Sequence, residues 1–130
     1  LVSLFAISFL VFYLIAIDAN PPIEITSEIT ISPSSVYPGD NVVMFSSYCK
    51  NTDADSVLST FWQREDGLIW QLKIRQVSIS KKGCYSASIP LTVPEDIPEG
   101  RWQRVNAATY KVNLLAQRTE TWRSEFIEVR

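Results

Sequence analysis

The 130-residue chain contains no histidine. That absence removes the most common general base, and with it the Ser-His-Asp and Cys-His catalytic arrangements and most zinc sites. The chain has only two cysteines, too few for a structural zinc site, and its four glycines are scattered singly, so no glycine-rich loop could cradle phosphate. We therefore expect a protein that is not an enzyme, with no catalytic residue, no metal and no cofactor.

Charge is absent from the first 17 residues, whose only polar side chains are Ser3, Ser8 and Tyr13. A membrane-spanning helix needs about 17–25 apolar residues, so this run predicts a transmembrane helix over 1–17 that acts as a signal anchor. The alternative is a cleaved signal peptide, whose apolar region is shorter, about 7–15 residues. Ile17-Asp18-Ala19 would be a poor cleavage site for it.

Basic residues are also absent after this run, because no lysine or arginine occurs before Lys50, whereas Asp18, Glu24 and Glu28 are acidic. Cytoplasmic flanks are rich in lysine and arginine, so the flank predicts an N-in, C-out orientation. The expected protein is a single-pass membrane protein whose β domain is periplasmic or extracellular. The net charge of −2 and this compartment argue against a nucleic-acid partner.

Residues 18–22 form the expected linker, in which Pro21 and Pro22 exclude a helix. From residue 23 to 130, short β-branched and aromatic runs alternate with turn residues, a pattern typical of sandwiches and barrels. About seven strands in this length predict an all-β, immunoglobulin-like antiparallel β-sandwich domain over 23–130. The expected strands cover 23–31, 41–50, 56–64, 68–75, 84–93, 101–114 and 120–129, with a short edge piece at 78–80.

The two cysteines lie on strands that are neighbours in such a sandwich. Cys49 ends the strand 41–50 and Cys84 begins the strand 84–93, which would run antiparallel beside it. A disulfide is therefore expected, as in other small extracytoplasmic domains. Two buried free thiols are the alternative.

Two segments carry a resemblance to a family. The segment 37–43, Tyr-Pro-Gly-Asp-Asn-Val-Val, opens a strand, and 89–102 combines a strand, a proline-bracketed loop, Gly100 and Trp102. The chain thereby resembles small phage and bacterial membrane-anchored proteins with a single Ig-like β-sandwich domain. The resemblance implies one membrane segment and one interaction domain acting at the host cell envelope. The Asp-x-Ala-x-Tyr-x-Cys pattern of antibody domains is missing, so antibody-type recognition does not carry over.

Four tryptophans are many for this length. We expect Trp62 in the core, and alternation predicts that Trp70, Leu72 and Ile74 share one face. Aromatic side chains beside arginines could instead contact a ligand, the alternative being a core or cation–π role. The ligand-contact candidates are Trp102, Trp122, Arg101, Arg104 and Arg123.

The sequence thus predicts a membrane-anchored, extracytoplasmic Ig-like binding module with a protein or glycan partner on the non-cytoplasmic side. Two alternatives stay open, a carbohydrate-binding accessory domain and a structural spacer or virion component.

Overall fold

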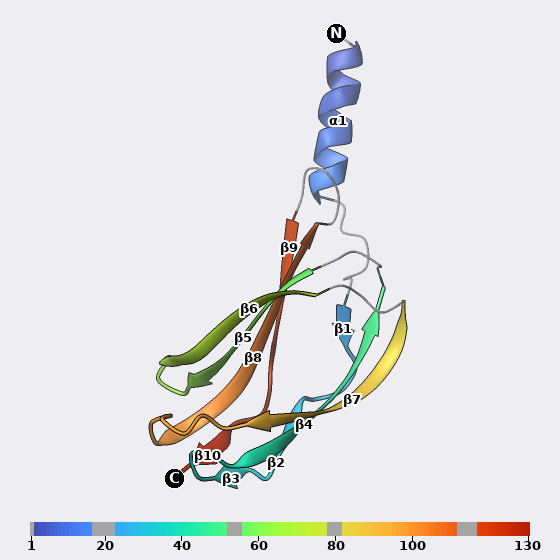
Figure 1. The fold of residues 1–130 in the computed structure, drawn as a ribbon. Helices are drawn as coiled ribbons and strands as arrows, with labels where there is room; N and C mark the ends of the chain where they lie inside the picture. The colour runs from blue at the N-terminus through green and yellow to red at the C-terminus, as the bar shows by residue number, and fades with distance from the viewer. Residues whose placement is uncertain (1, 17–22, 52–55, 78–81, 112–116) are drawn as a thin grey trace.

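The computed structural model describes residues 2–16, 23–51, 56–77, 82–111 and 117–130. In these residues one helix is followed by ten strands in two sheets, which confirms the predicted all-β sandwich (Figure 1). The elements are α1 (Val2–Ala16), β1 (Ile23–Ile25), β2 (Thr30–Ser32), β3 (Ser35–Val36), β4 (Asn41–Lys50), β5 (Ser56–Arg64), β6 (Ile69–Val77), β7 (Gly83–Thr92), β8 (Gly100–Lys111), β9 (Gln117–Arg123) and β10 (Ile127–Val129).

The transmembrane prediction over 1–17 is corrected by α1. This helix has 15 residues, and at 1.5 Å per residue it is about 22 Å long, against about 30 Å of bilayer hydrocarbon. Within the described residues no helix is long and apolar enough to cross a membrane. The prediction of a single-pass membrane protein is therefore wrong. The expected linker 18–22 and the edge piece 78–80 lie outside the described residues.

Each sheet is built around one long strand. In the first sheet β4 pairs with β7 along its whole length, and on its other side with β1 near Lys50 and β2 near Val43. In the second sheet β8 pairs with β5 on one side, and on the other with β10 and then β9. β6 continues that sheet beyond β5, so β6 and β7 are edge strands (Figure 1). Pro90 lies on the edge strand β7, as its missing amide donor required.

Two expected strands are each divided in the structure. The run 23–31 forms β1 and β2, which both pair with β4, and the run 120–129 forms β9 and β10, which both pair with β8. Both breaks lie at one level, where Ile29 bridges Ser124 and the Glu125 amide donates to the Ile29 carbonyl at 2.9 Å. The short strand β3, which the sequence did not reveal, then pairs parallel with β10, so the N-terminal segment crosses from one sheet to the other.

The hydrophobic core fills one half of the sandwich. Trp62 and Trp102 are its largest buried side chains, at 1% and 0% exposure, which confirms the prediction for Trp62. The Trp102 indole donates to the Pro98 carbonyl at 2.9 Å, so its polar group is satisfied inside the core. The other core members are Ile29, Ile31, Val36, Val42, Met44, Val93, Ile97, Ile127 and Val129.

A β-bulge in β6 overturns the predicted common face of Trp70, Leu72 and Ile74. Opposite β5, Trp62 pairs with Trp70, but Thr60 pairs with Lys73, so β6 has one residue more than its partner. Gln71 takes a positive φ of 52° at this point. Trp70 packs on the core while Leu72 and Ile74 turn outward, with 56% and 65% exposure. An inserted residue reverses the alternation beyond it, which is why these three do not share a face.

A candidate ligand cavity between the sheets

The inward-facing positions of β4 change from apolar to polar halfway along the strand. Val42 and Met44 are buried in the core. The next positions on the same face, Ser46, Tyr48 and Lys50, line a cavity instead. Because side chains alternate between faces along a strand, these five residues point between the sheets in turn.

The opposing sheet adds polar residues at some of its inward positions, beside the apolar Leu58 and Ala108. On β5 the core residue Trp62 is followed along the inner face by Thr60, Leu58 and Ser56, and all three line the cavity. On β8 the core residue Trp102 gives way to Arg104, Asn106 and Ala108, which line it too. The apolar core therefore stops at one level in both sheets.

Beyond that level lies an inter-sheet cavity of about 530 Å³. This is within the 300–1,000 Å³ of ordinary small-ligand sites. Trp122 of β9 and Tyr48 of β4 add aromatic rings to its lining from opposite sheets. Ile23 and Ile25 of β1 add apolar surface.

The exposed lining residues show where this inter-sheet cavity opens. Lys73 and Arg75 on β6, and Ile89 and Pro90 on β7, are exposed, whereas Lys50 on the central strand β4 is buried. The mouth therefore lies along the two edge strands. A second hollow of about 390 Å³ adjoins it, and Lys73 and Arg104 line both.

The charged residues of the lining are all cationic. Lys50, Lys73, Arg75 and Arg104 all line the inter-sheet cavity, and no described carboxylate does. Burial lowers the pKa of the Arg104 guanidinium, and the nearby charge of Arg75 lowers that pKa further. Arginine stays protonated at neutral pH despite such shifts, so this pair keeps two positive charges close together. The Arg104 guanidinium also lies over the Trp62 ring, 5.2 Å from its centroid, at the boundary with the core.

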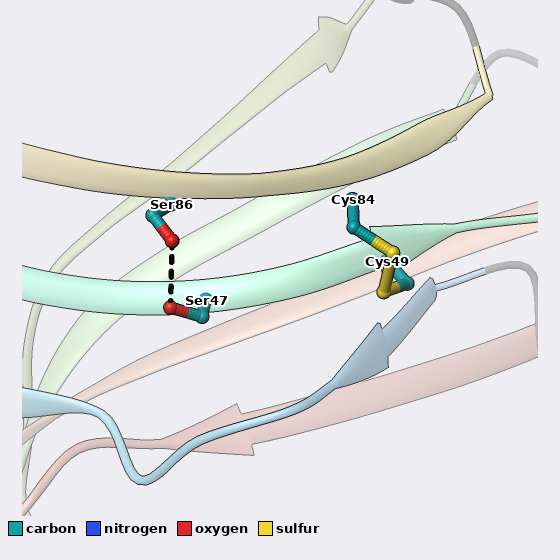
Figure 2. The surroundings of a disulfide bond; sticks show 4 residues. All are labelled: Ser47, Cys49, Cys84 and Ser86. Carbon is teal, nitrogen blue, oxygen red and sulfur yellow. Dashed lines mark hydrogen bonds between the residues drawn. A yellow bond between two sulfur atoms is a disulfide. The ribbon is translucent and has the colours of Figure 1, made fainter.

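The predicted disulfide is confirmed between Cys49 and Cys84, whose Cα atoms lie 4.0 Å apart on directly paired positions of β4 and β7 (Figure 2). Two residues along the same pair, the Ser47 and Ser86 hydroxyls are 3.0 Å apart (Figure 2). These odd-numbered positions of β4 face away from the inter-sheet cavity. The disulfide therefore stabilises the strand pair that forms one wall, at the end of the sandwich where the core is missing.

The structure separates the five predicted ligand-contact residues. Trp122 and Arg104 line the inter-sheet cavity, whereas Trp102 is a core residue. Arg101 lies outside, pairing with Glu65 at 2.7 Å and covering the Phe126 ring. Arg123 is exposed on the opposite face of β9 from Trp122 and donates to the Gln63 side chain.

Three cationic lining residues, Lys50, Lys73 and Arg75, were missed by the sequence reasoning. Lys50 could have been found, because it continues the inward register of Val42 and Met44. Lys73 and Arg75 could not, because they face inward only as a result of the bulge at Gln71.

The turn between β5 and β6 has its own charged contact, far from the inter-sheet cavity. The Arg64 guanidinium donates to both Asp66 carboxylate oxygens, at 2.7 and 2.9 Å, and covers the Trp102 ring. These hydrogen bonds, with one from the Leu68 amide, lower the pKa of Asp66 to about 2. The turn is thus closed by a carboxylate that stays ionised over nearly the whole pH range.

Comparison with known proteins supports the fold. No family model and no curated protein matches the sequence. Among solved structures, the chain is similar to the C-terminal domain of Wzt, with a TM-score of 0.55 and 13% identity, over 87% of this chain and 76% of that one. At this identity the likeness shows the fold alone.

Two further structures are less similar. One is the Pseudomonas fluorescens alkylpurine DNA glycosylase AlkC bound to DNA containing an abasic site analog, with a TM-score of 0.49, 13% identity, and coverage of 86% of this chain and 31% of that one. The other is the sporulation control protein Spo0M from Bacillus subtilis, with a TM-score of 0.36, 15% identity, and coverage of 85% and 50%. Neither bears on function at these scores.

Proposed function

We propose that this chain is a non-catalytic binding module with an immunoglobulin-like fold, and that it takes its ligand into the inter-sheet cavity. The observation that carries the proposal is the change from an apolar core to a mixed lining, in which polar and cationic side chains join apolar ones, at one level in both sheets. Proteins depart from the rules of core packing mainly at functional sites, and an open cavity between the two sheets is such a departure.

The strand order supports the immunoglobulin-like assignment. One sheet follows the order β1/β2, β4, β7 and the other β6, β5, β8, β9/β10. This corresponds to strands A, B and E facing strands C′, C, F and G of an immunoglobulin-like sandwich. The cysteine bridge then joins strands B and E within one sheet, unlike the inter-sheet bridge of antibody domains.

The absence of histidine supports a function without chemistry, because it removes the most common proton-transfer group. The lining cations offer charge and hydrogen-bond donors, and the lining hydroxyls lack an adjacent histidine that could activate them. These lining groups can therefore bind a ligand in a preformed site, without reacting with it.

Carbohydrate is the ligand class that the lining supports best. Trp122 and Tyr48 offer aromatic rings for packing against a sugar, and Ser46, Thr60 and Asn106 offer hydrogen-bonding groups for its hydroxyls. The resemblance to phage and bacterial single-domain Ig-like proteins adds the proposal that the partner is a component of the host cell envelope. Neighbouring genes for envelope, lysis or tail proteins would support a partner in the host cell envelope.

A cavity-filling substitution tests the site. We expect Ser46→Leu, which extends the apolar register of Val42 and Met44, to abolish the tryptophan fluorescence change produced by whichever probe wild type binds. The probes are glucose, glucuronate, glucose 6-phosphate and peptidoglycan fragments. Ser47→Leu is the matched control, because it adds the same volume to the opposite face of β4. Unaltered binding by Ser46→Leu, or no response of wild type to any probe, would contradict the proposal.

A further inference from the structure

Building on the proposed function, we infer that the inter-sheet cavity selects an acidic sugar, a saccharide unit that carries a carboxylate or a phosphate. The cationic lining would hold the oxyanion, and the hydroxyl, amide and aromatic lining would hold the sugar body.

The first argument is the contrast between arginines inside and outside the inter-sheet cavity. Outside it, Arg64, Arg101 and Arg118 each pair with a carboxylate at 2.7 Å, and Arg123 donates to the Gln63 side chain. Among the described residues, no ion pair is made by Lys73, Arg75 or Arg104, and no described carboxylate lines the inter-sheet cavity beside them. The chain has 14 acidic residues against 12 basic ones, so a general excess of basic residues does not explain this arrangement.

The second argument is the bulge in β6. With regular pairing from Trp70 onward, Leu72 and Ile74 would face Thr60 and Leu58 and fill the inter-sheet cavity. The bulge instead puts Lys73 and Arg75 in those places and leaves the two large aliphatic side chains in water. Exposing two large apolar side chains costs stability, while Lys73 and Arg75 line the mouth and remain exposed there. An anionic ligand gives this costly arrangement a function.

The third argument is the position of Arg104. Its guanidinium lies over the Trp62 ring, 5.2 Å from the centroid, at the base of the inter-sheet cavity. Stacking of this kind fixes the orientation of the planar group, which can then bind the two oxygens of one carboxylate or phosphate. Arg75 and Lys73 reach the same space from the mouth, and Lys50 reaches it from the opposing sheet. The carboxylate of Glu120 on β9 does not compete with a ligand for these cations, since it pairs with Arg118.

The sugar body is inferred from the neutral lining. Thr60 and Asn106 lie on directly paired positions of β5 and β8, next to Lys73 on one side and Trp122 on the other. This row across the sheet places a cation, two hydrogen-bonding groups and an aromatic ring side by side. Such a sequence of groups complements an anionic sugar better than a bare inorganic ion.

Isothermal titration calorimetry of the full chain with four probes tests this inference. The probes are glucuronate, glucose 6-phosphate, glucose and inorganic phosphate. We expect both acidic sugars to bind, with glucose and inorganic phosphate each at least about 10-fold weaker, since a hydrogen bond to a charged group is worth about one to two powers of ten in affinity. The affinity of the acidic sugars should also fall as salt is raised.

Charge-removing variants locate the effect. Arg75→Gln should weaken the binding of both acidic sugars by about 10- to 100-fold and leave glucose unchanged. Arg123→Gln is the matched control, because it removes an equal charge from the outer face of the same sheet and should change neither. Because Arg75 is exposed, its substitution should leave folding intact, which circular dichroism would verify.

The outcomes separate this inference from the proposed function. If glucose binds as tightly as glucuronate and Arg75→Gln has no effect, while Ser46→Leu still abolishes binding, the acidic class is wrong and the inter-sheet site stands. If inorganic phosphate binds as tightly as glucose 6-phosphate, the sugar body is wrong. If no probe binds, both the inference and the proposed function are overturned.

Discussion

Removing the disulfide should destabilise the sandwich by about 3–4 kcal/mol. Cys49 and Cys84 are 35 residues apart, and a cross-link across a loop of this length lowers the chain entropy of the unfolded state by about that amount at 25 °C. The bonded pair also lies at the end of β4 and β7 where the inter-sheet cavity replaces the core, so little apolar packing is present there to compensate.

The assay is urea unfolding of wild type and the Cys49→Ala/Cys84→Ala variant, followed by tryptophan fluorescence. With a urea dependence of about 2 kcal/mol per molar, the midpoint should fall by about 2 M. The control is Ser47→Ala/Ser86→Ala on the same strand pair, whose lost hydroxyl contact should cost no more than about 1 kcal/mol. A cysteine variant within about 1 kcal/mol of wild type would refute the reasoning, because the bridge would then constrain no long unfolded loop.

Three further predictions concern the packed half of the sandwich. Gly100→Ala should lower the free energy of unfolding, measured by thermal unfolding, by about 1–3 kcal/mol, and by more than Gly67→Ala does. Both glycines have positive φ, but a Cβ at Gly100 would lie 2.7 Å from the Arg64 side chain, whereas at Gly67 nothing lies within 4 Å. Equal losses in the two variants would contradict this. Asp66 should titrate near pH 2 by NMR in folded wild type and closer to the ordinary value of about 3.9 in Arg64→Gln. Because folding lowers this pKa, the contribution of Asp66 to stability is complete above about pH 4 and is lost as the pH falls toward 2; an unchanged midpoint in Arg64→Gln would contradict the cause. Trp62→Ala should cost about 3–5 kcal/mol, as for other buried aromatic residues, and a loss below 1 kcal/mol would contradict its central place in the core.

The long strands could be predicted closely from the sequence. The expected strands 41–50 and 56–64 coincide with β4 and β5, because β-branched and aromatic runs there end at clear polar loops. The cysteine pairing was also predictable, since it follows from which strands are neighbours. The breaks after β1 and β9 could not be predicted, because the alternation of side chains continues through them in the sequence. They become visible only in the pairing of the short strands with β4 and β8. The membrane span was predicted from composition alone, and the 15-residue helix α1 is too short for one.

The candidate site was predictable in part. Arg104 and Trp122 were singled out as aromatic or cationic residues, but the same criterion also selected Trp102, Arg101 and Arg123, which lie in the core or on the outer surface. Residue type alone does not indicate which face of a strand a residue occupies.

The bulge at Gln71 explains why Lys73 and Arg75 were not predicted as lining residues. A positive φ at a glutamine has no signature in sequence, and the single extra residue decides that cations rather than aliphatic side chains face the inter-sheet cavity.

The location of the ligand site is tested most directly by mapping amide chemical shifts in ¹⁵N NMR spectra during titration with glucuronate. Binding in the inter-sheet cavity predicts that the largest shifts lie on the inner residues Ser46, Thr60 and Asn106. Shifts confined to the outer surface around Arg101 and Arg123, or no shifts with any of the sugar probes, would contradict it.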